Sequence, residues 1–446
     1  MQKSKSKPMT RPNLIMTILA IALLLSISAA MFLHAEDAAK PQWFKGNLHT
    51  HSLWSDGDDF PEMIADWYAT RGYHFLALSD HNILSQGEKW MLQRDINRRG
   101  GPLALGKYQK RFGDEWVQMR GEDDKREVRL RPLSEFRKLI EKPGSFLMIQ
   151  AEEVTDKFGK QPIHINVSNI QEVIKPQGGT SVQDVMTKNL KLVEEQMAKT
   201  GKPMLPHLNH PNFVWGVTAE DLAAVVFERF FEVHNGHPGV NQMGDATHPG
   251  IDRLWDIANT IRIAKMKSPP LFGVGTDDSH NYHGEPDSPN RIKRAESGRG
   301  WVMVRAKELS AEAIINAMTR GDFYASSGIT LSDVQFKDDT LTITIEPDGD
   351  ATFTTQFIGT LKDHDDRSEP VVDKEGNTLP ITRKYSADIG KILAEVKGPS
   401  ASYKLTGNEL YVRAIITSNK PPVNPSFKDQ MKQAWTQPVG WEKWIK

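Results

Sequence analysis

The sequence predicts an α/β domain followed by a smaller antiparallel β domain. Short apolar runs alternate with helix-like stretches from Trp43 to about Arg305, and this alternation is the pattern of an α/β fold. Histidine, aspartate and glutamate recur near the ends of those apolar runs. From Leu331 onward, apolar and polar residues alternate in segments rich in Thr, Val and Ile, which indicates antiparallel strands.

Seven apolar runs in the first part are predicted strands, and a helix joins the first two. The runs cover residues 43–48, 75–79, 146–149, 163–167, 204–207, 230–233 and 271–274, with residues 301–304 as a further candidate. After the first run, Pro61 suits the first turn of a helix and Gly72 can end it.

Residues 85–140 interrupt this rhythm with a charged insertion that has no evident regular structure. Long loops of this kind are often functional, so we expect the insertion to cross one face of the α/β domain. The sequence pattern changes near residue 329, from alternating strands and helices to strands alone. We therefore predict an α/β domain over residues 41–328 and a β domain, a small sandwich, over residues 329–446.

The first 35 residues have the layout of a secretory signal. Four basic residues from Lys3 to Arg11 precede an uncharged run from Leu14 to Leu33. An uncleaved N-terminal anchor is the alternative, because the run is about long enough to span a bilayer. The chain has no cysteine, so an exported protein of the bacterial periplasm would depend on core burial rather than on disulfides.

The balance of charge restricts the class of partner. The formal net charge is −1, so no overall field draws the chain to nucleic acid or to an anionic membrane. No basic patch with interleaved aromatic residues is evident in the sequence either. We therefore expect a small-molecule substrate, no nucleic acid, and membrane contact only through the N-terminal segment if it stays uncleaved.

Candidate metal ligands gather at the ends of the predicted strands. His49 and His51 follow the first strand, and side chains two apart in extended chain share a face. Later strand ends add further carboxylates and imidazoles: Asp80, His81, Glu152, Glu153, His164, His207, His210, Asp277, Asp278 and His280. The carboxyl ends of strands in a parallel α/β barrel converge on one mouth. The set therefore indicates a multinuclear centre rather than a closed structural zinc site.

Taken in order, these motifs resemble those of the PHP superfamily, named for polymerase and histidinol phosphatase. The matching segments are HTH followed by DG, then ALSDHN, EEVT, HIN, NHP and DSH, within residues 43–305. The resemblance implies a distorted seven-stranded (βα) barrel that holds two or three divalent ions such as Zn, Mn or Fe. The later run GRGWVMVRAKELSAEAIINAMTRGDFYASSG resembles a secreted or periplasmic branch with a β-rich C-terminal domain, similar to a carbamate-hydrolysing group.

The resemblance also implies which residues hold each ion. The first ion would be held by His49, His51, Glu153 and Asp278. Glu153 would bridge to a second ion, which is held also by His164 and His210. The third ion would be held by Asp56, His81 and His280. The doubled Glu152–Glu153 leaves the bridging residue open, and Glu153 is preferred because it precedes the Val-Thr pair.

Other candidates have alternative roles. Asp80 or His81 could assist proton transfer, and Asp278 completes the predicted catalytic set. Four side chains are candidates to meet an anionic substrate, with plain solvated charge as the alternative: Arg120, Arg129, Arg131 and His283. Three histidines could orient a ligand or line the mouth, or could simply be satisfied structural residues: His207, His234 and His237.

Three functions are compatible with the sequence. The first is a metal-dependent phosphoesterase that uses an activated water on a small phosphorylated molecule. The second is hydrolysis of a carboxylic or carbamate ester, or of an amide, by the same centre. The third is a non-catalytic polymer-binding protein with a structural metal site. The lack of cysteine and of a G-x-S-x-G elbow favours a water nucleophile in the first two cases.

Overall fold

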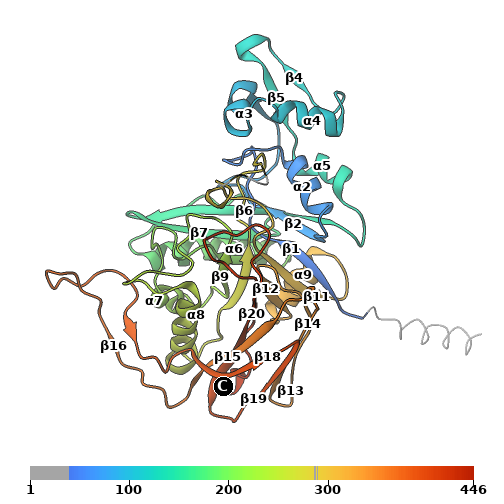
Figure 1. Ribbon diagram of the computed structural model, residues 1–446. Helices are drawn as coiled ribbons and strands as arrows, with labels where there is room; N and C mark the ends of the chain where they lie inside the picture. Colours follow the sequence, from blue (N-terminus) through green and yellow to red (C-terminus); the bar gives the residue numbers. More distant parts are fainter. Residues whose placement is uncertain (1–39, 286–287, 289, 446) are drawn as a thin grey trace, which may run out of the picture.

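The computed structural model describes residues 40–285, 288 and 290–445, as a mixed α/β structure with one large sheet and three smaller ones (Figure 1). The predicted signal segment, residues 1–35, lies outside the described residues. Within the described part of the chain, every helix is too short or too polar to cross a bilayer.

The large sheet has 13 strands. Its first seven, in spatial order, are β10 (Phe272–Thr276), β9 (Phe230–Asn235), β8 (Leu205–Leu208), β7 (Gln161–Ser168), β6 (Leu147–Phe158), β2 (Phe75–Leu78) and β1 (Gln42–Asn47). Each of these strands contains part of one of the apolar runs predicted as strands. Their spatial order is also their order along the chain, so neighbouring ends can gather ligands from the whole α/β part.

The structure does not confirm a parallel barrel. β7 pairs antiparallel with both β6 and β8, whereas the other neighbours in this set are parallel. The reason is the two-residue turn at Gly159 and Lys160, because so short a connection joins only antiparallel strands. Beyond β1 and β10, Thr50 and Ser279 form an isolated parallel bridge. This bridge brings together the segments that follow the two outer strands.

Helices connect these strands: α2 (Pro61–Ala69), α6 (Val182–Thr200), α7 (Ala219–Ala224) and α8 (Ile251–Thr260), the last continuing as the π-helical turn η2 (Ile261–Lys265). α2 begins at Pro61, whose fixed φ suits a first helical turn. Its buried Ile64 and Tyr68 pack in one apolar cluster with Leu76 of β2 and Phe136 of the insertion. α2 is thus covered on one side by the sheet and on another by the insertion.

The insertion is not an irregular loop, contrary to the expectation from its charged sequence. It contains β3 (Lys89–Leu92), α3 (Gln93–Gly100), α4 (Ala104–Phe112), β4 (Met119–Arg120), the 3₁₀ turn η1 (Asp123–Lys125), β5 (Glu127–Leu130) and α5 (Leu133–Ile140). Three of its strands form a sheet of their own, in the order β3-β5-β4, at the top of the view in Figure 1. Fully buried Val128 and Leu130 supply an apolar core that the surrounding charges obscure in the sequence.

A buried glutamate joins the insertion to α2. The carboxylate of Glu62 accepts hydrogen bonds from the Tyr108 hydroxyl at 2.7 Å and from the Trp116 indole at 3.1 Å. Because Glu62 is fully buried, burial raises the pKa of its carboxyl to about 7, although these donors oppose the shift. The carboxyl is therefore half neutral near physiological pH.

The C-terminal strands extend the large sheet instead of forming a separate layer pair. β11 (Trp301–Ala306) pairs with β1, and the order continues through β12 (Phe323–Ser326), β21 (Gln433–Thr436), β20 (Glu409–Ser418), β15 (Phe353–Leu361) and β18 (Lys391–Lys397). The helix α9 (Ala311–Thr319) connects β11 to β12, and the 3₁₀ turns η3 (Arg291–Lys293) and η4 (Glu442–Trp444) precede β11 and follow β21. The two halves of the chain thus share one continuous sheet.

A three-stranded sheet packs on these C-terminal strands, and a two-stranded ribbon projects beside them. The sheet contains β13 (Leu331–Lys337), β14 (Thr340–Ile345) and β19 (Ser400–Lys404), and the ribbon contains β16 (Ser368–Glu369) and β17 (Lys384–Tyr385). Leu341 and Ile343 of β14 share a buried apolar cluster with Phe357 of β15 and Val412 of β20. This two-layer packing gives the C-terminal part a sandwich-like core.

A buried ion pair ties the β-rich part to the α/β part. Arg413 of β20 donates to both carboxylate oxygens of Asp256 on α8, at 2.8 and 2.7 Å. The Tyr411 hydroxyl donates to the same carboxylate at 2.8 Å. Arg413 is fully buried and also lies 3.2 Å from Asp252, so loss of Arg413 would leave buried carboxylates without their cation.

We expect Glu62→Gln to make the protein more stable than wild type at pH 8 but not at pH 5. The folded pKa of about 7 lies above the usual 4.5, so the stability given by the neutral carboxyl is lost as pH rises from about 4.5 to 7. That loss is of the order of 3 kcal/mol, and glutamine avoids it. Melting temperatures of both proteins across this range measure the difference. A constant difference at every pH would contradict it.

Candidate metal centre

Short hydrogen bonds hold the first two histidines between the ends of β1 and β10. The side chain of Asn47, the last residue of β1, accepts a hydrogen bond from the His49 backbone N–H at 2.9 Å. The backbone N–H of Asp278 donates to the carbonyl of His49 at 3.0 Å, and the N–H of His51 donates to the carbonyl of Ser279 at 2.9 Å. His49 and His51 are fully buried, so their rings are fixed beside the carboxylate of Asp278.

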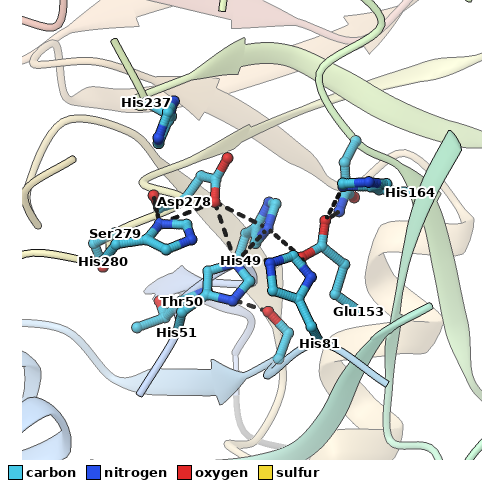
Figure 2. Close-up of polar contacts among 12 residues, drawn as sticks. His49, Thr50, His51, His81, Glu153, His164, His237, Asp278, Ser279 and His280 are labelled. Carbon is cyan, nitrogen blue, oxygen red and sulfur yellow. Dashed lines mark hydrogen bonds and ion pairs between the residues drawn. The ribbon is translucent and has the colours of Figure 1, made fainter. Parts of the chain in front are cut away.

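Glu153 of β6 lies at the centre of the histidines (Figure 2). Its Oε2 is 2.8 Å from His81 Nδ1 and 3.3 Å from His51 Nε2, while its Oε1 is 2.9 Å from His164 Nδ1 and 3.6 Å from His210 Nε2. The carboxylate therefore faces one set of imidazoles with each oxygen. His164 can reach Glu153 because β7 pairs antiparallel with β6, which places His164 opposite Thr155 of β6.

A second carboxylate, Asp278, faces the first two histidines. Its Oδ1 is 3.2 Å from Nε2 of both His49 and His51, and these two nitrogens are 3.1 Å apart. The ligand atoms of His49, His210 and Asp278 form one compact group, and those of His49, His51 and Glu153 form another. His49 belongs to both groups, so the two positions adjoin.

The outer part of the centre is open to solvent. It consists of His51, Asp56, His81 and His280, whose ligand atoms lie within 4.8 Å of one another. The Asp56 side chain is 52 % exposed, whereas that of Glu153 is 1 % exposed. A molecule could therefore approach the centre from the side of Asp56.

The structure brings all nine predicted ligands into one region: His49, His51, Asp56, His81, Glu153, His164, His210, Asp278 and His280. The grouping differs from the implied one in four respects. His51 also belongs to the outer group, and His81 also groups with Glu153 and His164. His210 groups with His49 and Asp278 instead of with Glu153 and His164, and His49 forms a further group with His207 and Glu232.

This donor set fits divalent cations. Nδ1 of His51, Oε2 of Glu153 and Nδ1 of His164 are buried and make no hydrogen bond of normal geometry, although other ligand atoms lie within ion-pair distance of them. Buried polar atoms are rarely left in that state. Imidazole nitrogens and carboxylate oxygens in mixed sets suit Zn, Mn or Fe. The absence of cysteine separates the set from thiolate-rich structural zinc sites.

The electrostatics of Glu153 and His51 agree with this fit, whereas nearby carboxylates outweigh burial and raise the pKa of His49, His81, His210 and His280. Burial opposes charge on Glu153, but His81, His49 and His164 outweigh it and hold the pKa of the carboxyl well below its usual range. Burial lowers the pKa of His51 to about 4, with His280 contributing. Carboxylates that stay ionised and an imidazole that stays neutral are the protonation states in which these groups bind metal.

Glu232 of β9 is a functional residue that the sequence reasoning missed. Its carboxylate accepts hydrogen bonds from the backbone N–H of His210 and the side chains of Thr276 and Asn235, all at 2.7 Å, and lies 2.6 Å from Nδ1 of His49. A carboxylate on the far nitrogen of a metal-binding imidazole fixes its orientation and tautomer. The signal was a lone glutamate within the apolar run FFEV.

The structure separates the two neighbouring glutamates and assigns Asp80 a positioning role. Glu152 points away from the histidines and accepts a hydrogen bond from the Ile174 backbone N–H at 3.0 Å. Asp80 accepts four hydrogen bonds, from the backbone N–H and hydroxyl groups of Ser52 and Ser55, at 2.6 to 3.0 Å. Asp80 therefore orders the turn before Asp56, and its expected part in proton transfer stays a prediction.

The predicted substrate-binding arginines form ion pairs within the insertion, and their contact with a substrate stays a prediction. Arg120 pairs with Glu127 at 2.6 Å, and Arg129 and Arg131 both pair with Glu135 at 2.7 Å. Local ion pairs of this kind fix side chains that the sequence presents as available cations. His283 likewise lies 3.1 Å from the Asp58 carbonyl and lines the base of the insertion.

The remaining histidines have distinct surroundings. His207 is fully buried, with Nε2 3.6 Å from Glu232. His234 stacks on Trp435 and lies 3.0 Å from the Arg299 carbonyl. His237 differs from both, because its ring lies 5.5 Å from that of His280 at the edge of the centre (Figure 2).

Backbone strain occurs at two of the ligands. His210 has φ +23° and Asp278 has φ +48°, in a region that non-glycine residues seldom adopt. Such conformations persist where surrounding contacts enforce them and are concentrated at functional sites. Asn235 supplies one of these contacts by donating to Asp278 at 3.1 Å.

Solved structures similar to this chain include two distant neighbours. No family model matches the chain, and no curated protein matches it. A two-domain protein from Bacteroides vulgatus, described as containing a predicted PHP-like metal-dependent phosphoesterase, aligns over 90 % of this chain and 96 % of its own, at 15 % identity and a TM-score of 0.38. PsfC from Pseudomonas syringae aligns over 62 % of this chain and 88 % of its own, at 9 % identity and a TM-score of 0.31.

We expect Glu153→Gln to lose bound metal while its neighbour variant Glu152→Gln retains it. Glutamine removes the negative charge that faces five imidazoles, whereas Glu152 lies on the other face of β6. Metal content after dialysis against trace divalent ions measures the loss directly. Equal metal content in the two variants would contradict a central role for Glu153.

We expect Glu232→Gln to weaken metal binding by about 10- to 100-fold without abolishing it. The variant keeps a side chain of similar size beside His49 but removes the charge that orients the ring. Glu228→Gln is the matched control, because Glu228 is buried nearby and bonds only backbone groups of the same turn. Titration of the metal-free proteins measures the affinities, and an unchanged value for Glu232→Gln would refute the assignment.

Proposed function

We propose that the protein is a metal-dependent hydrolase that acts on a small phosphate ester outside the cytoplasm. The observation that supports this proposal is a set of adjoining ligand groups, two of which share Glu153, with a solvent-exposed side at Asp56. A structural site would be closed by its ligands. The exposed outer group argues instead for a centre that a substrate can reach, and against a polymer-binding protein with a structural metal.

Divalent ions in these groups would supply a nucleophile from water and neutralise charge on the oxygens of the ester. The chain contributes the placement of those ligands. Glu232 and Asn235 orient His49 and Asp278, while Asp80 orders the turn that carries Asp56. His81, which lies 3.4 Å from Asp56 through Nε2, is the histidine best placed to exchange a proton with solvent.

A phosphate ester is favoured over a carboxyl ester as the substrate because several ligand groups adjoin at the centre. A phosphate ester presents several charged oxygens, which two or three adjoining cations can meet together. A specific observation favours the second candidate, a carboxylic or carbamate ester. The cavity beside His280 includes Pro238, Ile292 and Phe427 in its wall, and an apolar wall also suits an uncharged ester.

We expect the purified protein to hydrolyse phosphate monoesters in a metal-dependent manner. A panel of phosphate mono- and diesters and carboxyl esters should show the highest kcat/KM for a monoester. Removal of metal by a chelator should abolish the activity, and Zn, Mn or Fe should restore it. Rates measured with and without each metal provide the comparison.

Asp278→Ala serves as the inactive control, because it removes a carboxylate 3.2 Å from both His49 and His51. A preference for carboxyl esters would shift the assignment to the second candidate. Metal binding without hydrolysis of any ester class would refute the proposed function.

A further inference from the structure

A cavity of about 580 Å³ lies beside the metal centre, and we call it the side cavity. Residues in its lining include His237, His280, Ile292, Lys293, Ser426 and Phe427. Its volume falls in the range of pockets that bind small organic molecules. The side cavity is therefore large enough for much more than a phosphate group.

The side cavity is continuous with the centre through His280. His280 is a member of the outer ligand group and also lines the cavity. His237 lies between the two, with its ring 5.5 Å from that of His280. The Gly239 backbone N–H donates to Nδ1 of His237 at 3.0 Å, so the neutral ring carries its proton on Nε2 and can donate a hydrogen bond to a ligand.

Separate parts of the chain form the walls, and a buried arginine holds them together. The walls come from residues 237–239, from residues 280–281, 292–293 and 295, and from the β20–β21 loop at residues 426–427. The guanidinium of Arg299 donates to the carbonyls of Gly236 and Arg291 and to the side chain of Asn424, at 3.0, 2.9 and 3.1 Å. Arg299 is 1 % exposed, so it acts as a fixed brace behind all of these walls.

The β20–β21 loop belongs to the C-terminal part of the chain but is fastened to the α/β part. Asn424 accepts from Arg299 and donates to the Ser297 carbonyl at 3.2 Å. Ser426 is held by Gln430, whose side chain accepts its backbone N–H at 2.6 Å. These contacts fix the loop so that half-buried Phe427 lies in the wall of the side cavity.

We propose that the side cavity binds the organic group of the ester, and that Phe427 determines which organic groups are accepted. The inference rests on the proposed function and deepens it. The reacting group would lie at the outer ligands, and its organic substituent would extend past His280 toward Ile292 and Phe427. Bulky substituents with apolar surface, such as an aryl ring, bind better than small polar ones because they bury that surface. The β-rich part thereby contributes directly to substrate selection.

The test compares two non-hydrolysable ligands, phenylphosphonate and methylphosphonate, on the metal-loaded full-length protein. Calorimetry should show that wild type binds phenylphosphonate more tightly. Phe427→Ala should weaken the binding of phenylphosphonate about tenfold, because the apolar contact between the two rings is lost. The same variant should change the affinity for methylphosphonate less than twofold. With phenyl phosphate as substrate, KM should rise by a similar factor while kcat stays within twofold.

The matched control is Val423→Ala. Val423 lies on the same loop, is 89 % exposed and is not in the cavity lining, so the variant should match wild type for both ligands. Phe427→Tyr should retain the preference for the phenyl group. Metal content and melting temperature of each variant establish that the centre and the fold are intact.

The outcomes separate the cavity from the proposed function. Equal weakening of both phosphonates by Phe427→Ala, no weakening of either, or no phenylphosphonate binding by metal-loaded protein overturns the role of the side cavity. Phenylphosphonate binding that depends on Phe427, in a protein that hydrolyses no ester, upholds the cavity and refutes the proposed function instead.

Discussion

The buried carboxylate of Glu153 is the constraint on which the rest of the site depends. A negative charge that is 1 % exposed is tolerated in a protein interior only when positive or polar groups surround it. Five imidazoles from four segments of the chain meet this requirement. Their nitrogens converge so closely that buried lone pairs remain unmatched within the described chain, and a cation is the partner that satisfies carboxylate and imidazole together. Folding thus concentrates ligands before any substrate binds.

The supporting groups show how the fold maintains this concentration. Glu232 holds His49 and the backbone of His210, and Asn235 holds Glu232 and Asp278. Both supporting residues lie on β9, so one rigid strand orients ligands that come from three other segments. Strained backbone at His210 and Asp278 is consistent with ligand geometry that is enforced by the surroundings rather than preferred locally.

The continuous sheet gives the β-rich part a role near the centre. Because β11, β12 and β21 link β1 to β20 in one sheet, the loop between β20 and β21 is positioned relative to the ligands by main-chain pairing. The ion pair of Arg413 on β20 with Asp256 on α8 also fixes the β-rich part relative to the α/β part. The reacting centre and the adjoining cavity can therefore be assembled from different parts of the chain without a flexible link between them.

The sequence by itself determined the local features. The strand positions followed from short apolar runs, the start of α2 from Pro61, and the candidate ligands from residue types placed at strand ends. Only the tertiary structure decided the antiparallel course of β7, the ordered insertion and the partners of Glu232, Asp80 and Arg129. The physical reason is that a local pattern records which side chains are buried or can bind metal, whereas hydrogen bonds and ion pairs between distant segments decide which of them meet. Glu152 and Glu153 illustrate the difference, since alternation along β6 puts them on opposite faces, and packing alone decides which face the histidines occupy.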